Sequence, residues 1–198
     1  MKKLKSSLLN MVLVLTLITI VAGSALAYVN YATSTQIETI KAETLAKGIK
    51  QVMGVDENAD FQYSTEEAGD YTLYRSELGT AVQSVTNGFG GALKVLVGFD
   101  HEGTILGYTI LEHAETPGLG AKAGDWFQKG QKGDIIGKKP GERKLQVSKD
   151  TNDKQDIDAI TASTITSRAF LLAVQNAYEQ LKQPDAASGA TAKEGGQN

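Results

Sequence analysis

Side chains suited to phosphate chemistry are concentrated between residues 161 and 167, where five Ser or Thr residues occur within seven positions. Apolar residues follow at helical spacing and predict a helix; they are Phe170, Leu171, Val174, Tyr178 and Leu181. Ser167 or Thr166 is the expected N-cap of this helix. Free amides and the helix dipole favour an anion at such an end, so this segment is the best phosphate-handling position in the chain. The alternative is that the hydroxyls only cap the helix.

A second unusual segment is the loop Glu115-Thr116-Pro117-Gly118-Leu119-Gly120. Its proline restricts Thr116 to extended backbone, and two glycines and a hydroxyl lie close to a carboxylate. Such a loop can bring backbone amides close to a planar ligand. The glycine cluster at residues 88–91 is more typical of a turn, and neither segment matches a dinucleotide fingerprint or a Walker loop.

Composition excludes several other kinds of site. The chain of 198 residues has no cysteine, which removes disulfides, Fe–S clusters, thiolate zinc sites and thiol nucleophiles. With only two histidines, a histidine-based metal centre or catalytic triad is also disfavoured, and His101 is expected to be a solvated turn residue. The formal net charge of −3 makes nucleic acid a poor partner.

The N-terminal part of the chain predicts a membrane anchor. No charged residue occurs between Lys5 and Glu38, and residues 8–28 are almost wholly apolar, which is long enough to cross a bilayer. Three lysines precede this stretch, so residues 1–7 are expected in the cytoplasm and the remainder outside the cell membrane. A signal peptide cleaved after Ala27 is the alternative.

The elements between these segments predict an α+β fold with a partly antiparallel sheet and packed helices. A capping-box pattern at Thr35 begins an amphipathic helix that Gly54 ends. Strand patterns follow at residues 71–74, 81–85, 93–99 and 104–111, and residues 100–103 form a hairpin turn between the last two. Residues 29–183 are therefore expected to form one domain outside the membrane, and residues 184–198 a disordered tail.

The order of these motifs resembles the FMN-binding domain of the G subunit of Rnf-type electron-transport complexes. The C subunit of sodium-pumping NADH:quinone reductase shares that domain. The resemblance rests on Gly-Phe-Gly-Gly at 88–91, the 115–120 loop and the string from Asp158 to Ser167, and it extends to the single N-terminal anchor.

The resemblance implies that a flavin transferase links FMN, through its phosphate, to the hydroxyl of the threonine that ends the string. By position this is Thr164; Asp158 and Thr161 match the string, and Ser163 precedes the acceptor. It also implies that a loop lies against the isoalloxazine, with Leu119 supplying an apolar face and Thr116 bonding at the ring edge; the loop residues are Glu115, Thr116, Gly118, Leu119 and Gly120. Lys149 can pair with the phosphate or the anionic reduced flavin, or can simply be solvated.

Two features depart from the family pattern. Ala162 and Ser163 stand where the family has Gly and Ala, so a turn that requires positive φ at residue 162 would impair modification. Residues 185–191 match the attachment string letter for letter and end at Thr191, but they lie in a low-complexity stretch that cannot bury a ring. Thr164 is therefore the expected acceptor.

Together these observations predict an electron relay that carries covalent FMN within a membrane ion-translocating ferredoxin:NAD oxidoreductase and is not catalytic alone. The expected partners are the other subunits, a flavin transferase and the membrane. One alternative is the homologous subunit of the quinone-reducing complex. The other is an anchored extracytoplasmic binding or sensor domain without flavin.

Overall fold

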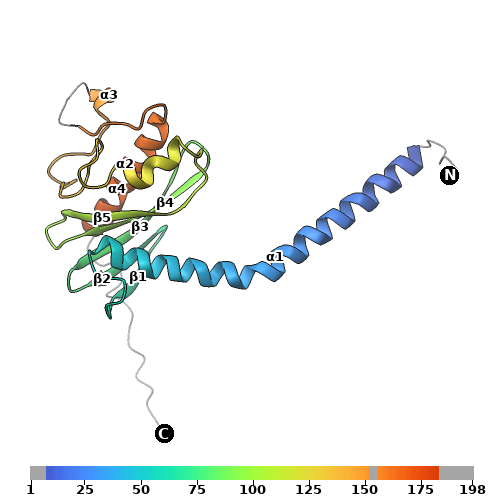
Figure 1. Cartoon of the computed structure of the whole chain (residues 1–198), viewed down its shortest axis with the longest axis horizontal. Coiled ribbons are helices and arrows are strands. Elements are labelled where there is room, and N and C mark those ends of the chain that lie inside the picture. The colour runs from blue at the N-terminus through green and yellow to red at the C-terminus, as the bar shows by residue number, and fades with distance from the viewer. Residues whose placement is uncertain (1–7, 152–155, 183–198) are drawn as a thin grey trace, which may run out of the picture. The chain divides into compact units, whose positions relative to one another are not determined.

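The computed structural model describes residues 8–151 and 156–182. A long helix, α1 (Leu8–Val52), precedes five strands and a C-terminal helical region (Figure 1). The strands are β1 (Ser64–Ala68), β2 (Tyr71–Ser76), β3 (Gly79–Asn87), β4 (Ala92–Phe99) and β5 (Ile105–His113). The remaining elements are η1 (Gly120–Lys122), α2 (Ala123–Trp126), α3 (Ser148–Thr151) and α4 (Thr164–Lys182). Residues 1–7 and 184–198, for which a cytoplasmic segment and a disordered tail are predicted, lie outside the described residues.

Helix α1 contributes to two compact units, which divide the chain after Thr44. In the first unit, the stretch Leu8–Ser34 is long and apolar enough to cross a membrane. The expectation that a separate helix begins at Thr35 is wrong, because α1 continues through this position without a break. No proline or glycine occurs between residues 29 and 47 to interrupt the backbone ladder. The helix ends just before Gly54, as predicted.

The five strands form one antiparallel meander in the order β1-β2-β3-β4-β5. This confirms the predicted α+β class, and the sheet is antiparallel throughout its named strands. The turn at residues 100–103 joins β4 to β5, with the Asp100 amide bonded to the Thr104 carbonyl at 3.0 Å. His101 is exposed in that turn, as expected. Strand β1 has no counterpart among the predicted strands.

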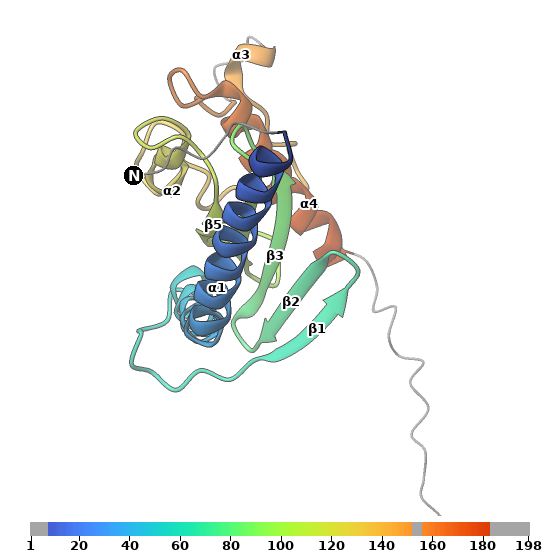
Figure 2. The same ribbon diagram turned by 90° about the vertical axis from the view of Figure 1, so that its right-hand side faces the viewer.

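Alternate residues of β2, β3, β4 and β5 face two separate cores. Val95 and Val97 of β4 face the core that includes α4, whereas Leu96 faces a smaller core with Ile49 and Val52. The last turns of α1 therefore cover one face of the sheet and α4 covers the other. Figure 2 shows β1, β2 and β3 side by side, with α4 behind them.

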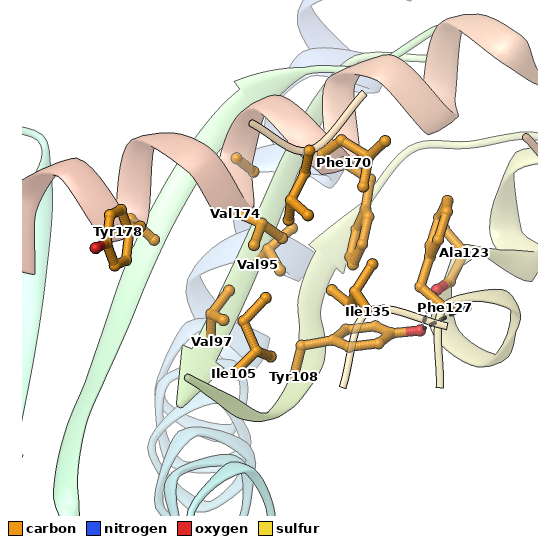
Figure 3. Packing of buried hydrophobic residues seen from close by; sticks show 14 of the residues in the cluster. Val95, Val97, Ile105, Tyr108, Ala123, Phe127, Ile135, Phe170, Val174 and Tyr178 are labelled. Carbon is orange, nitrogen blue, oxygen red and sulfur yellow. Dashed lines mark hydrogen bonds between the residues drawn. The ribbon is translucent and has the colours of Figure 1, made fainter. Parts of the chain in front are cut away.

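Aromatic packing connects the start of α4 to the segment after β5. The Phe127 and Phe170 rings stack with centroids 4.3 Å apart, and the Tyr108 ring meets Phe170 at 4.7 Å (Figure 3). The Tyr108 hydroxyl donates to the Ala123 carbonyl at 2.8 Å and accepts from the Phe127 amide at 3.1 Å. Burial raises the pKa of Tyr108 far above its ordinary value. This core fixes α4 relative to the loops around its first turn.

Candidate functional site

The helix that carries the hydroxyl cluster begins earlier than the sequence predicts. Helix α4 starts at Thr164, so Ser163 and not Thr166 or Ser167 precedes its first turn. The Ser163 carbonyl accepts from the Ser167 amide at 3.0 Å and from the Ser167 hydroxyl at 2.9 Å. The Ser167 hydroxyl in turn accepts from the Ile160 amide at 3.0 Å. These buried bonds use Ser167 within the turn and leave Thr164 as the first helical residue.

The turn before Thr164 requires an unusual backbone conformation. Ala162 has φ of +61°, and among the described residues it is the one non-glycine with positive φ. This is the position at which the resemblance implies a glycine. The Ser163 amide donates to the Ile160 carbonyl at 3.0 Å and closes this turn. Ala162 thus holds a conformation that glycine adopts at lower cost.

The 115–120 loop contains a tight turn at its centre. The Leu119 amide donates to the Thr116 carbonyl at 3.1 Å, with Pro117 and Gly118 as the central residues. Gly118 has φ of +76°, as the third position of a type II turn requires. The turn leaves Thr116 and Leu119 exposed and buries Glu115 and Gly120 at its two ends.

Glu115 joins three separate segments of the chain. Its side chain is buried, with 5% of its surface exposed. Oxygen Oε1 accepts from the backbone amides of Phe89 at 2.7 Å and Gly90 at 3.4 Å. Oxygen Oε2 accepts from the Thr166 hydroxyl at 2.7 Å. The 88–91 turn, the 115–120 loop and the first turn of α4 therefore meet at one carboxylate.

A second group of contacts forms around Asp158. Its carbonyl accepts from the Trp126 indole at 2.8 Å, and its carboxylate accepts from the Ser148 hydroxyl at 3.1 Å. The Ser148 amide also donates to the Ile157 carbonyl at 2.9 Å. The exposed Lys149 therefore follows, in the chain, a residue that is hydrogen-bonded to Asp158.

The dipole at the start of α4 favours an anion, although the Glu115 carboxylate already bonds to Thr166 of this turn. The turn contains no acidic residue of its own, and α4 is 19 residues long. Arg168 lies one turn further along, where it pairs with Asp150 of α3. This ion pair holds the pKa of Asp150 below its ordinary value, chiefly through the side-chain hydrogen bond from Arg168.

Three exposed apolar side chains belong to the segments that meet at Glu115. Phe89, Leu119 and Ile165 are 68%, 42% and 52% exposed. The Phe89 amide donates to Glu115. Leu119 precedes Gly120 and Ile165 precedes Thr166, and both of these neighbours lie close to the Glu115 carboxylate. Solvent-exposed apolar side chains beside a helix N-terminus suit a ligand with a planar ring and a phosphate. The residues present therefore fit FMN.

The predicted site residues thus fall into two groups. The first group is the 115–120 loop, which Glu115 joins to the first turn of α4. The second is Asp158 and Lys149: Asp158 is hydrogen-bonded to Ser148, which precedes Lys149 in the chain. Thr161 is exposed and Ser163 is buried. Thr191 lies outside the described residues. Sequence reasoning missed the roles of Thr166 and Trp126, since only the fold brings their partners to them.

Comparison with known proteins identifies the class of domain. The FMN-binding domain family matches residues 88–179, which include both glycine segments and the start of α4. The G subunit of a sodium-translocating ferredoxin:NAD(+) oxidoreductase complex from Acetobacterium woodii is 34% identical, over 79% of this chain and 83% of the relative.

Other relatives are G subunits of similarly named complexes. The G subunit of a proton-translocating ferredoxin:NAD(+) oxidoreductase complex from Clostridium ljungdahlii is 31% identical, over 84% of this chain and 88% of the relative. The G subunit of an ion-translocating oxidoreductase complex from Cereibacter sphaeroides is 35% identical, over 84% and 81%. The chain belongs to the family of G subunits of Rnf-type ion-translocating oxidoreductase complexes and has an FMN-binding domain. Its apolar N-terminal helix and these relatives together support a membrane location.

Proposed function

We propose that this chain carries FMN covalently on Thr164 and relays electrons within a membrane ion-translocating ferredoxin:NAD oxidoreductase. The observation that carries the proposal is the Thr164 position at the start of α4, whose first turn contains no acidic residue of its own. The turn before Thr164 forms although Ala162 has positive φ, so the departure from glycine does not prevent this turn. Free amides and the helix dipole there stabilise the charge that a phosphodiester retains. Bound flavin supplies the redox chemistry, so electron transfer needs no acid, base or nucleophile from the chain.

Attachment requires one exchange at phosphorus. The Thr164 oxygen forms a bond to the flavin phosphorus, while the bond from phosphorus to the leaving group of an activated flavin nucleotide breaks. The hydroxyl proton departs with that leaving group, and no electrons are exchanged. Relative to free FMN and the unmodified chain, the product lacks one water. A flavin transferase would catalyse this step, because no side chain of α4's first turn is a base suited to it.

The remaining site residues would position the flavin. In this proposal Leu119 provides an apolar surface to the ring and Thr116 forms a hydrogen bond at its edge, with Gly118 and Gly120 shaping the loop. Thr161, Ser163 and Asp158 form the attachment string, and Lys149 provides a positive charge near the phosphate. Support comes from the exposure of Thr116 and Leu119 and from the Ser148–Asp158 hydrogen bond.

The relatives' names support the proposed partners, and the N-terminal lysines support the proposed orientation in the membrane. The relatives' names include both sodium- and proton-translocating complexes, so the proposal extends to ion translocation without naming the ion. The other subunits would exchange electrons with the flavin. Lysines at positions 2, 3 and 5 favour a cytoplasmic N-terminus, with the FMN domain on the opposite side of the membrane.

Flavin fluorescence of the denatured chain tests the attachment. Full-length protein produced with a flavin transferase is separated in a denaturing gel, together with Thr164→Val and Thr191→Val. We expect fluorescence from the wild type and Thr191→Val, and none from Thr164→Val. Fluorescence that persists in Thr164→Val and disappears in Thr191→Val would move the acceptor to the tail, and a dark wild-type band would contradict covalent attachment.

A further inference from the structure

Glu115 is a buried carboxylate whose hydrogen-bond donors are neutral. Among the described residues, two backbone amides and one hydroxyl donate to it. The donors come from residues 26, 25 and 51 positions away in the sequence. Such a group is costly to bury unless its bonds are all made, so the three segments are held together or released together.

The glycines around Glu115 show how closely the segments approach. A Cβ added at Gly88 would lie 1.9 Å from Oε1 of Glu115, and one added at Gly120 would lie 2.4 Å from Oε2. The Cβ added at Gly120 would also lie 2.8 Å from the Thr166 hydroxyl oxygen. Both loops therefore lack side chains where the carboxylate sits. The glycine clusters, each of which alone resembles an ordinary turn, share this carboxylate.

We propose that Glu115 is a positioning residue that sets the Thr164 acceptor against the two glycine loops before flavin is attached. One oxygen holds the 88–91 turn and the other holds Thr166, two residues beyond the acceptor. The segments that carry the exposed apolar side chains at 89, 119 and 165 are thereby held at the first turn of α4, which the acceptor begins. The inference rests on the proposed function, and it assigns to Glu115 a role that acts through Thr166 instead of through contact with the ring.

The Glu115 contact has two arms: Oε1 accepts from the amides of the 88–91 turn (the amide arm), and Oε2 accepts from Thr166 (the α4 arm). Substitution can separate them. Thr166→Val has nearly the same shape but lacks the hydroxyl, so it removes the α4 arm and leaves the amide arm. Thr166→Ser retains the hydroxyl and is the matched control. Glu115→Ala removes both arms, whereas Glu115→Gln can accept from the amides and donate to the Thr166 oxygen. Glu115→Asp shortens the side chain by one methylene and keeps its charge.

Two measurements on the full-length chain test the proposal. The first is the rate at which a flavin transferase modifies each variant, followed by mass spectrometry, with circular dichroism as the check on folding. The second is hydrogen exchange of the Phe89 and Gly90 amides. We expect Thr166→Val to be modified roughly tenfold to a hundredfold more slowly than the wild type, because small displacements of a reacting group have effects of that order. Thr166→Ser should recover most of the rate.

Hydrogen exchange should distinguish the arms. Protection of the Phe89 and Gly90 amides should persist in Thr166→Val and Glu115→Gln and be lost in Glu115→Ala. A folded Thr166→Val that is modified at the wild-type rate would overturn the proposal, as would unchanged amide exchange in Glu115→Ala. If Thr166→Val does not fold, Glu115→Asp takes its place: it shortens the reach to the amides and to Thr166 together, and a folded Glu115→Asp that is modified at the wild-type rate would equally overturn the proposal. A wild type that accepts no flavin contradicts the proposed function instead, and amide exchange then still decides whether Glu115 holds the turn.

Discussion

At the level of single residues, the turn before Thr164 combines backbone strain with several buried hydrogen bonds. Ala162 occupies the left-handed region, which costs an L-residue with a Cβ about 1–2 kcal/mol. The turn nevertheless forms, because Ser167 bonds to both of its ends and the first turn of α4 is held by Glu115. Glycine would adopt this conformation at lower cost, and alanine is tolerated here at a cost in stability.

Replacing Ala162 with glycine should stabilise the chain. Relief of the positive φ outweighs the extra unfolded-state entropy of glycine, which is about 0.4–1 kcal/mol, so a net gain of about 0.5–1 kcal/mol is expected. Urea unfolding of the wild type and of Ala162→Gly measures the difference in the free energy of unfolding. Ala159→Gly, at a residue with ordinary φ, is the matched control and should lose stability. A loss of stability in Ala162→Gly would show that the turn does not require positive φ.

The Asp150–Arg168 pair should titrate in a defined direction. The pKa of Asp150 is lowered in the folded chain, so its contribution is fully present above the ordinary value of 3.8 and is lost as pH falls through the lowered pKa. Both side chains remain in contact with solvent, so the effect on overall stability is small. Carboxyl NMR should give a pKa below 3.8 in the wild type and a higher one in Arg168→Gln. Equal values in the two chains would exclude the pair in solution.

Among the secondary-structure elements, the sheet is fixed on both faces by helices that approach it closely. The end of α1 lies against β4 and β5, where glycines leave room for its backbone. A Cβ added at Gly98 would lie 2.3 Å from the Val52 carbonyl oxygen and 3.1 Å from the Val52 side chain. On the other face, the Thr86 hydroxyl donates to the Ala169 carbonyl at 3.0 Å and joins β3 to α4.

Gly98→Ala should therefore destabilise the domain by about 1–3 kcal/mol, because the added methyl group meets backbone that cannot move independently of α1. Gly124→Ala is the matched control, since nothing lies within 4 Å of its added Cβ. Urea unfolding should show a lower midpoint for Gly98→Ala alone. Equal midpoints for both variants would mean that the end of α1 is not packed against β4.

Local patterns predict most of the elements but not their long-range contacts. Strands β2 to β5 and α4 follow from apolar periodicity, and the 100–103 hairpin follows from its turn residues. Strand β1 is Ser-Thr-Glu-Glu-Ala, which has no apolar alternation, and its pairing with β2 alone reveals it. The start of α4 is misplaced by sequence reasoning because Thr166 and Ser167 are typical capping residues. Their side chains instead bond to Glu115 and Ser163, which are contacts that no local pattern encodes.

Over its full length, the chain combines an apolar helix with a compact FMN-binding domain. The first unit ends at Thr44 and the second begins at Leu45. The span Leu8–Ser34 extends several residues past the predicted anchor of residues 8–28. Membership in a family of complex subunits accounts for this organisation, because a relay must stay beside the subunits with which it exchanges electrons.

The absence of cysteine allows the orientation to be measured without background. Lys132→Cys places a single thiol at an exposed position of the domain, and Ser6→Cys places one before the apolar span. A membrane-impermeant maleimide applied to spheroplasts should label the chain with cysteine at 132 and not the chain with cysteine at 6. The reverse labelling would place the domain in the cytoplasm.

Peptide mass spectrometry tests covalent attachment at Thr164 most directly. The full-length chain is produced with a flavin transferase, denatured to strip non-covalent flavin and digested with trypsin. Cleavage after Lys154, Arg168, Lys182 and Lys193 separates Thr164, in residues 155–168, from Thr191, in residues 183–193. We expect the mass of one FMN less water on the 155–168 peptide, with fragmentation assigning it to Thr164. The same mass on the 183–193 peptide alone, or no adduct on either, would contradict attachment at Thr164.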